Sequence, residues 1–192
     1  MPNKLISYLK LYHQISAAEE QYIVEAFNPK MFKEGEALSQ PGSISKELFF
    51  IVDGVLRIVI RNEKGNEVTH YFLKENQFCT ILNSFHKQIP AEECIQAACN
   101  CEVLSINRTT LLKLYEQVPY LKTLIDQITQ QALIDKINIR NTYLGQDSAN
   151  RYRLFVARQA DIALRVSLTD VASYLGITPQ SLSRIRRQMI SR

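Results

Sequence analysis

Apolar residues recur with two different periods along the chain, and the change from one to the other divides it. From residue 30 to 107 the apolar runs are short, rich in β-branched and aromatic residues, and separated by glycines. Such runs at about ten-residue spacing predict an antiparallel sandwich or roll. From residue 107 onward the apolar positions recur every three or four residues, which predicts helices to the end of the chain.

One helix is also predicted ahead of the strands, over about 16–27. Ser16 and Glu19 have the spacing of a capping box, apolar residues follow them, and Asn28-Pro29 ends the pattern.

Strands are predicted over residues 47–52, 55–60, 67–73, 95–98 and 102–106. Asp53-Gly54 separates the first two, and Asp-Gly between β-rich runs is a strong hairpin signal. We therefore expect these two strands to form a hairpin. A second turn is expected over Asn62–Asn66.

The longest helical pattern begins at Pro119 and meets no helix-breaking residue before Gly145. At about 1.5 Å per residue it spans roughly 39 Å, longer than the roll needs for its own cover. We therefore expect it to pair with the same helix of a second copy. The alternative is a helix that only covers the core of its own chain. The expected seam contains the apolar residues Leu121, Leu124, Ile125 and Ile128.

Residues 169–187 carry the pattern of a helix-turn-helix. Thr169 is expected to cap the first helix, Gly176 to supply a left-handed turn, and Thr178-Pro179 to begin the second helix. Three apolar residues are expected to face inward from the second helix: Leu182, Ile185 and Met189.

The outward side of the second helix is polar and basic. It is expected to consist of Thr178, Gln180, Ser181, Ser183, Arg184 and Arg187. Short hydrogen-bonding side chains together with arginine suit the edges of bases in the major groove. A purely structural helical hairpin would not require this set, so the motif predicts binding to double-stranded DNA.

Charge is distributed unevenly within a net charge of +4. Residues 148–192 hold eight arginines against two acidic residues, a net +6, while the 15 basic and 17 acidic residues before them give −2. A basic segment on a mildly acidic body favours a polyanionic partner for that segment.

Composition excludes several classes of protein. A hydrophobic content of 46% excludes disorder, and no apolar run approaches the ~18 residues of a membrane span. We see no signal peptide. The four cysteines lie between Cys79 and Cys101, which favours a reduced, cytoplasmic protein with structural cysteines over redox sensing or metal binding. No P-loop or nucleophile elbow is present, so we expect no enzyme, cofactor or metal.

Together these residues resemble the catabolite-activator/Fnr (Crp/Fnr) family of bacterial transcription regulators. The matching segments are 33–36, Gly42, 48–57, Gly65, Phe78, 101–106, the helix from Pro119 and the terminal motif. Residues 172–187 are similar to the branch common in the Bacteroidetes. The resemblance implies an α+β protein with a β-roll sensor domain over 1–118, a dimerisation helix and linker over 119–146, and a helix-turn-helix domain over 147–192. It also implies a homodimer that binds double-stranded DNA and responds to an unknown small-molecule effector. RNA polymerase is a candidate protein partner.

The effector site departs from the family pattern. Cyclic-nucleotide-binding members carry Gly-Glu after the residue matching Phe78, and an Arg-Ser/Thr-Ala turn before the next strand. Here Phe78 is followed by Cys79, Thr80 and Ile81, while Ala91, Glu92 and Glu93 fall at the phosphate turn, and Lys136 replaces a Thr or Ser that contacts adenine. Two carboxylates repel a phosphate, so we expect no binding of cyclic AMP in the family manner.

The DNA-reading helix departs less. Arg184 keeps the position that reads guanine, whereas Pro179 removes an arginine and Gln180 replaces a glutamate that contacts cytosine. The alternative function is a small-molecule sensor or interaction module without specific DNA binding. The arginine-rich face favours DNA.

Overall fold

The strands form two antiparallel sheets that enclose one core. The computed structural model describes residues 2–190, and in that part seven strands are present. One sheet has the order β1-β7-β2-β5 and the other the order β4-β3-β6. The bounds are β1 Asn28–Phe32, β2 Glu47–Asp53, β3 Leu56–Arg61, β4 Glu67–Leu73, β5 Phe78–Cys79, β6 Cys94–Ala97 and β7 Cys101–Asn107. The predicted antiparallel roll is confirmed.

Strand β2 is buried on both faces, which explains why its sequence is apolar without alternation. Phe49 and Ile51 point between the two sheets, together with Leu56 of β3 and Val103 of β7. Phe50, from the same strand, points to the other side, into a core shared with helices. The sheet of β2 therefore separates two apolar layers.

The hairpin expected at Asp53-Gly54 is wrong. β2 and β3 lie in different sheets, and the chain crosses from one sheet to the other at this point. Gly54 has a φ of +101°, and a Cβ there would lie 2.5 Å from the carbonyl oxygen of Asn100 and 2.7 Å from Sγ of Cys101. Asp-Gly thus supplies a left-handed backbone and a close approach rather than a hairpin turn. The turn at 62–66 does join two paired strands, β3 and β4.

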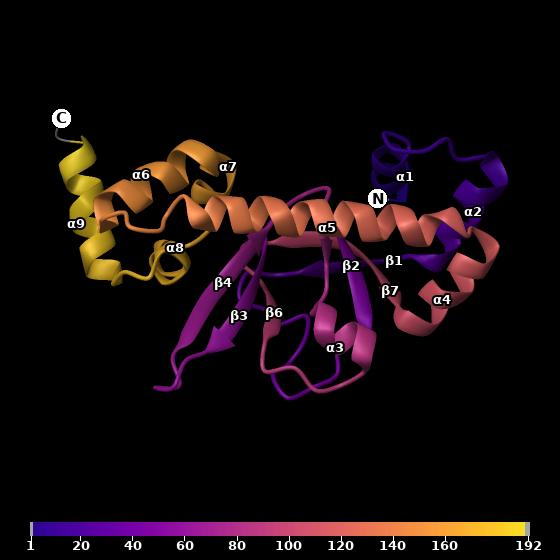
Figure 1. The fold of residues 1–192 in the computed structure, drawn as a ribbon, viewed down its shortest axis with the longest axis horizontal. Coiled ribbons are helices and arrows are strands. Elements are labelled where there is room, and N and C mark those ends of the chain that lie inside the picture. The colour runs from indigo at the N-terminus through magenta and orange to yellow at the C-terminus, as the bar shows by residue number, and fades with distance from the viewer. Residues whose placement is uncertain (1, 191–192) are drawn as a thin grey trace.

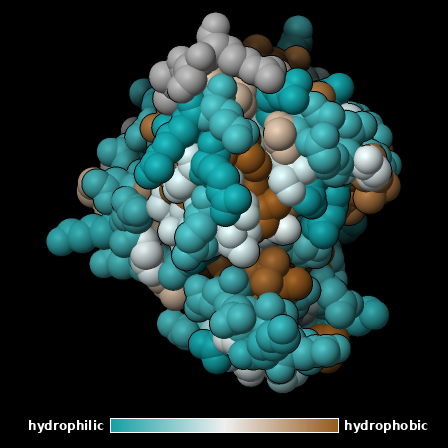
Figure 2. All heavy atoms as spheres, turned by 90° about the vertical axis from the view of Figure 1, so that its left-hand side faces the viewer, coloured by the Kyte–Doolittle hydropathy of each residue, from teal (hydrophilic) through white to brown (hydrophobic). Residues whose placement is uncertain are grey.

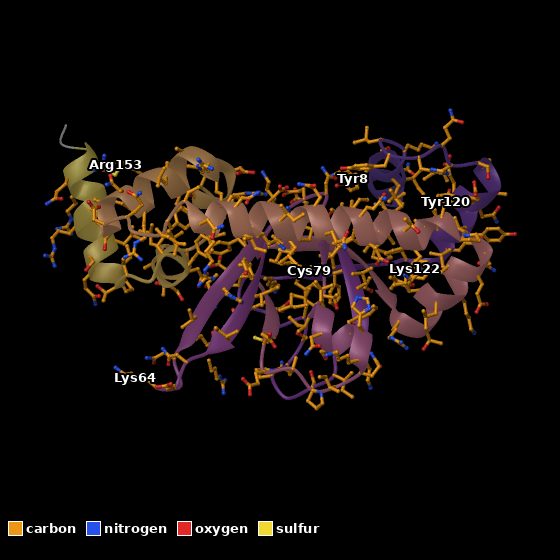
Figure 3. The ribbon with its side chains drawn as sticks, in the orientation of Figure 1. Tyr8, Lys64, Cys79, Tyr120, Lys122 and Arg153 are labelled. Carbon is orange, nitrogen blue, oxygen red and sulfur yellow. The ribbon has the colours of Figure 1, made fainter. Side chains whose placement is uncertain are left out.

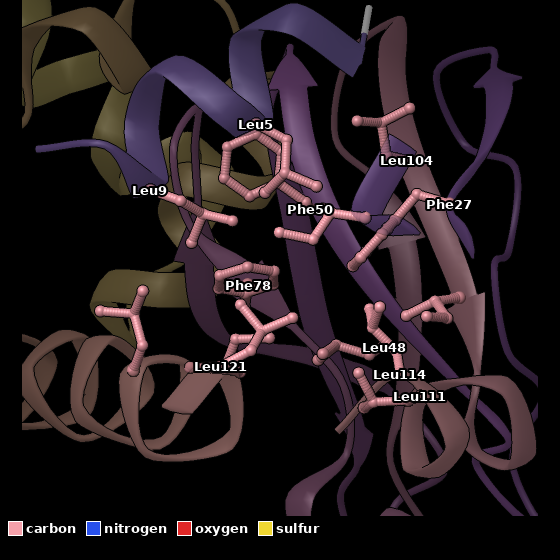
Figure 4. Close-up of a cluster of buried hydrophobic side chains, with 14 of the residues drawn as sticks. Leu5, Leu9, Phe27, Leu48, Phe50, Phe78, Leu104, Leu111, Leu114 and Leu121 are labelled. Carbon is pink, nitrogen blue, oxygen red and sulfur yellow. The ribbon is translucent and has the colours of Figure 1, made fainter. Parts of the chain in front are cut away.

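Helices cover the outer face of the first sheet, and Figure 1 places them at the N-terminal end of the molecule. They are α1 Pro2–Leu9, α2 Ala17–Ala26 and α4 Arg108–Gln117, while the short α3 Leu82–Lys87 lies between β5 and β6. The capping box at Ser16 and Glu19 is confirmed, because each residue accepts a hydrogen bond from the backbone amide of the other. Figure 4 shows the buried side chains beneath these helices, Leu5, Phe50 and Leu114 among them.

Helix α5, Tyr120–Asn141, runs along most of the molecule (Figure 1). Its first half lies on the roll, and the four residues expected at a dimer seam are buried there in the core of their own protomer: Leu121, Leu124, Ile125 and Ile128. From Gln130 to Asn141 every residue is at least partly exposed. The surface available to a partner is therefore on the second half of α5.

The C-terminal helices share a third core with the roll. They are α6 Ser148–Arg158, α7 Ala160–Ala163, α8 Leu168–Leu175 and α9 Pro179–Ile190. Phe155 and Leu175 are buried against Phe72 of β4 and Val55, which follows the crossover. The helical unit is thus docked on the β-roll. No helix in the described part is long and apolar enough to span a membrane.

Candidate functional site

Helices α8 and α9 form a helix-turn-helix whose geometry is set by local hydrogen bonds. Gly176 joins the helices with a left-handed φ of +65°. The Thr178 hydroxyl accepts a hydrogen bond from the amide of Ser181 at 3.1 Å and caps α9. The cap of α8 is Ser167, which accepts from the amide of Asp170 at 3.1 Å, so the expectation of Thr169 is wrong. Leu168 and Thr169 already belong to the helix, which therefore begins two residues earlier than a cap at Thr169 would allow.

Helix α9 lies at one end of the molecule (Figure 1), and most residues of its polar side are exposed. Four of the predicted DNA-contacting residues are exposed, and the two serines are partly buried: Thr178, Gln180, Arg184 and Arg187, with Ser181 and Ser183. Figure 2 views this end and shows mostly hydrophilic atoms. Leu182 anchors the opposite side and is fully buried.

The inward face of α9 is shorter than expected. Ile185 is only partly buried, and Met189, expected to face inward, is 40% exposed. Among the described residues of α9, only Leu182 belongs to the core shared with the roll, so the buried face of the helix is confined to its first turns.

Helix α8 lies against the edge strand β4 and ties the helix-turn-helix to the β-roll. The Ser173 hydroxyl accepts a hydrogen bond from the amide of Thr69 at 2.9 Å. Arg57 forms an ion pair with Asp170, and both side chains are at least 86% removed from solvent. Arg57 also donates from Nε to Gln96 at 2.7 Å. A buried ion pair with additional hydrogen bonds favours a single relative position of α8 and the strands that it contacts.

A second group of ion pairs joins the same two parts of the chain. Lys74 pairs with Asp161, and Arg165 donates to both carboxylate oxygens of Glu75, at 3.1 Å from Nη2 to Oε2. Burial would raise the pKa of Glu75, but hydrogen bonds from Arg165 and from the Gly54 amide hold that pKa below its ordinary value. The Glu75 carboxylate is therefore charged near neutral pH.

A cavity of about 210 Å³ lies between the roll and α5. Five of the predicted sensor residues line it: Phe78, Thr80, Ile81, Glu93 and Lys136. The other three lie elsewhere. Cys79 points between the sheets because it follows Phe78 on a strand, Ala91 is buried in the same interior, and Glu92 is exposed. Figure 3 places Cys79 among the strands below α5.

His70 and Tyr71 also line the cavity, and the sequence did not identify them. A β-bulge explains both. Ile58 of β3 pairs with Tyr71, and the next residue pairs with Thr69, so His70 is left out of the ladder. A bulge turns two consecutive side chains toward one side, which strict alternation cannot predict.

The charges of the cavity differ from those a phosphate requires. Lys136 lies 5.7 Å from the ring centroid of Tyr71, and burial lowers its pKa. Burial and the nearby Arg140 lower the pKa of His70. Glu93 is the facing carboxylate, and no arginine lines the cavity among the described residues. The site can hold an apolar body and one small anionic group, but it lacks the cationic turn that holds a cyclic phosphate.

Comparison with known proteins identifies the fold. Residues 29–118 match the family model of the cyclic nucleotide-binding domain. No protein of curated function matches the sequence. Among solved structures, the c-di-GMP responsive global regulator CLP of Xanthomonas campestris has a TM-score of 0.71 at 13% identity and covers 92% of each chain.

Two further structures agree. A putative transcriptional regulator of the Crp/Fnr family from Eubacterium rectale has a TM-score of 0.68 at 18% identity, covering 96% of this chain and 88% of that one. The catabolite activator protein of Thermus thermophilus has a TM-score of 0.56 at 15% identity, covering 96% and 87%. The chain therefore has the fold of Crp/Fnr regulators, and these named relatives are regulators rather than enzymes. The similarity to the Bacteroidetes branch stays a prediction.

Proposed function

We propose that this protein is a DNA-binding transcription regulator that reads its site with α9. One observation carries the proposal: a capped helix at the end of the molecule presents Gln180, Arg184 and Arg187 to solvent. The named relatives with this fold are regulators, which supports the same function. Arg184 forms no ion pair with any described residue, so its guanidinium is available to a base edge.

The second half of α5 is proposed as the dimer seam. Ile134 is 50% exposed and Ile137 is 45% exposed, on the side of α5 that faces away from the cavity-lining Lys136. Isolated apolar side chains at helical spacing on such a helix favour pairing with a second copy. A two-fold dimer would place the two α9 helices on half-sites about one helical turn of DNA apart.

The sensor cavity is proposed to bind a ligand other than a cyclic nucleotide. Lys136 supplies one cation, Tyr71 and Ile81 supply apolar walls, and Glu93 disfavours a phosphate. A small apolar molecule with a single anionic group fits this chemistry. Cyclic AMP should bind with a dissociation constant no better than about millimolar. Titration calorimetry that gives a micromolar constant would overturn this part of the proposal.

The test of DNA binding is selection from a pool of random duplexes by the full chain, followed by titration of the selected and scrambled duplexes at two salt concentrations. We expect a palindromic site and a steep loss of affinity with salt. Weak binding without any enriched sequence would favour the alternative, a sensor or interaction module without specific DNA binding.

A further inference from the structure

Two cysteines bracket one backbone residue at the point where the chain crosses between the sheets. Cys99 and Cys101 flank Asn100 in the turn from β6 to β7. The amide of Val55 donates to Sγ of Cys99 at 3.2 Å, and the thiol of Cys101 donates to the carbonyl of Val55 at 3.2 Å. Cys99 is half-buried, whereas Cys101 is buried.

Cys99 differs from the other three cysteines in the direction of its pKa shift. A hydrogen bond from the Cys101 thiol lowers the pKa of Cys99, and Arg165 adds a smaller effect in the same direction. The same contact raises the pKa of Cys101. Burial raises the pKa of Cys79 to about 12 and also raises that of Cys94. The thiolate is the reactive form, so Cys99 is the cysteine best suited to attack an oxidant.

We propose that Cys99 and Cys101 form a peroxide-oxidisable dithiol at the junction of the sensor roll and the DNA-binding helices. The Cys99 thiolate attacks one oxygen of a hydroperoxide, the O–O bond breaks, and Cys99 becomes a sulfenic acid. The thiol of Cys101 then attacks that sulfur, the hydroxyl leaves as water with the thiol proton, and a disulfide forms. Two thiols lose two electrons, and hydrogen peroxide is reduced to two waters.

The spacing of the cysteines permits the bridge. Two residues of extended chain span at most about 7 Å. Disulfides join Cα atoms up to about 6.8 Å apart, so a bridge requires Asn100 to depart only slightly from the fully extended form. Both sulfurs lie against the backbone of the same residue, Val55, and the Cys101 thiol also donates to the carbonyl of Cys99 at 3.0 Å.

The dithiol is connected to the domain contact through Gly54. The Gly54 amide donates to Glu75 at 2.8 Å, and Glu75 holds Arg165 of the DNA-binding unit. Gly54 lies so close to Cys101 that even a Cβ would approach its sulfur to 2.7 Å. A disulfide removes the Cys101 donor to Val55 and moves this sulfur, so Gly54 and the Glu75 carboxylate must shift with it. Oxidation therefore loosens the contact between Glu75, which follows β4, and Arg165, which precedes α8.

The first experiment maps oxidation in the reduced, full-length protein treated with equimolar hydrogen peroxide. Free thiols are alkylated, and the tryptic peptide 88–108 is sequenced by tandem mass spectrometry. This peptide also holds Cys94, which serves as an internal control. We expect a disulfide between Cys99 and Cys101, with Cys79 and Cys94 alkylated. Oxidation of Cys94 or Cys79 at the rate of Cys99 would overturn the proposal.

Two variants separate the steps. Cys101→Ser should leave a sulfenic acid on Cys99 that dimedone traps, and Cys99→Ser should give neither product. Cys101→Ala replaces Cys101→Ser if the hydroxyl prevents folding. A dimedone adduct on Cys94 in place of Cys99 would contradict the assignment.

The second experiment measures hydrogen exchange in the same samples. We expect amides of β4 and α8 to exchange about tenfold faster in the oxidised wild type and to be unchanged in treated Cys99→Ser. If the disulfide forms while exchange stays the same, the link to the domain contact is wrong. Neither experiment contains DNA, so its failure is distinct from failure of the proposed function.

Discussion

Arg184 and Arg187 lie one turn apart on α9, yet they are expected to act differently on DNA. Arg184 is on the exposed side opposite the buried Leu182, where its guanidinium can reach guanine O6 and N7 together. Arg184→Ala should lower affinity for the specific palindrome by about 2–6 kcal/mol per dimer and leave non-specific binding nearly intact. If the substitution weakens binding to the specific and the scrambled duplex equally, Arg184 contacts only the DNA backbone and does not read a base.

Arg187 provides the matched comparison, because it is nearer the end of the helix and is expected to contact phosphate. Arg187→Ala should weaken binding to every duplex to a similar degree and reduce the salt slope by about one per subunit. The measurement is titration at two salt concentrations. A loss confined to the palindrome would instead assign Arg187 to base reading.

Gly54 gives a prediction about stability. Gly54→Ala forces a Cβ to within 2.5 Å of the Asn100 oxygen at a positive φ, so we expect a loss of about 3 kcal/mol or more. Gly65→Ala is the control, because Gly65 has a φ of +77° and a Cβ there would meet no atom within 4 Å; it should cost about 1 kcal/mol. Denaturant unfolding measures both, and equal losses would show that crowding at Gly54 does not matter.

At the scale of elements, local signals in the sequence predicted five of the seven described strands closely, but the short elements β1, β5, α1, α3 and α7 were not predicted. The capping box at Ser16, the turn at 62–66 and the αL glycine of the helix-turn-helix all depend on neighbouring residues, and all are confirmed. The prediction of a hairpin at Asp53-Gly54 was wrong because the same local backbone conformation also occurs where a chain crosses from one sheet to another. Which strand pairs with which is decided by distant residues.

Helix α5 shows the same limit. Its apolar stripe predicted a buried face, but a stripe does not say whether the roll or a second copy covers it. Leu121 and Ile128 turn out to face the roll. At the sensor site the chemistry of Lys136 and Glu93 could be predicted from position, whereas His70 required the β-bulge.

Two substitutions on α5 separate the roles of its halves. Ile128→Asp places a charge in the core and should destabilise the monomer by about 3 kcal/mol or more. Ile134→Asp changes a residue that is 50% exposed and should leave the melting temperature nearly unchanged while weakening the dimer. Sedimentation equilibrium and thermal unfolding report the two effects. If the wild-type protein sediments as a monomer at micromolar concentration, the proposed dimer is wrong.

At the scale of the whole molecule, the contact between Glu75 and Arg165 makes stability depend on pH. The folded pKa of Glu75 is below its ordinary value of about 4.3, so its contribution is present above that pH and is lost as pH falls through the folded pKa. Glu75→Gln should therefore lower the melting temperature at pH 7, and the difference from wild type should vanish in acid. A difference that persists in acid strong enough to protonate every carboxylate would mean that ionisation of Glu75 is not its source.

The docking of α8 has a further consequence for solubility. Strand β4 ends its sheet, and the hydroxyl of Ser173 occupies the amide of Thr69 that would otherwise be free to pair with another chain. An uncovered sheet edge is a template for aggregation. Asp170→Asn weakens the ion pair to Arg57 and should raise light scattering on mild heating before the roll itself unfolds. Helix α8 would then both support α9 and protect the edge of β4 from pairing with another copy of the chain. A signal that releases α8 would expose this edge to self-association for as long as α8 is detached.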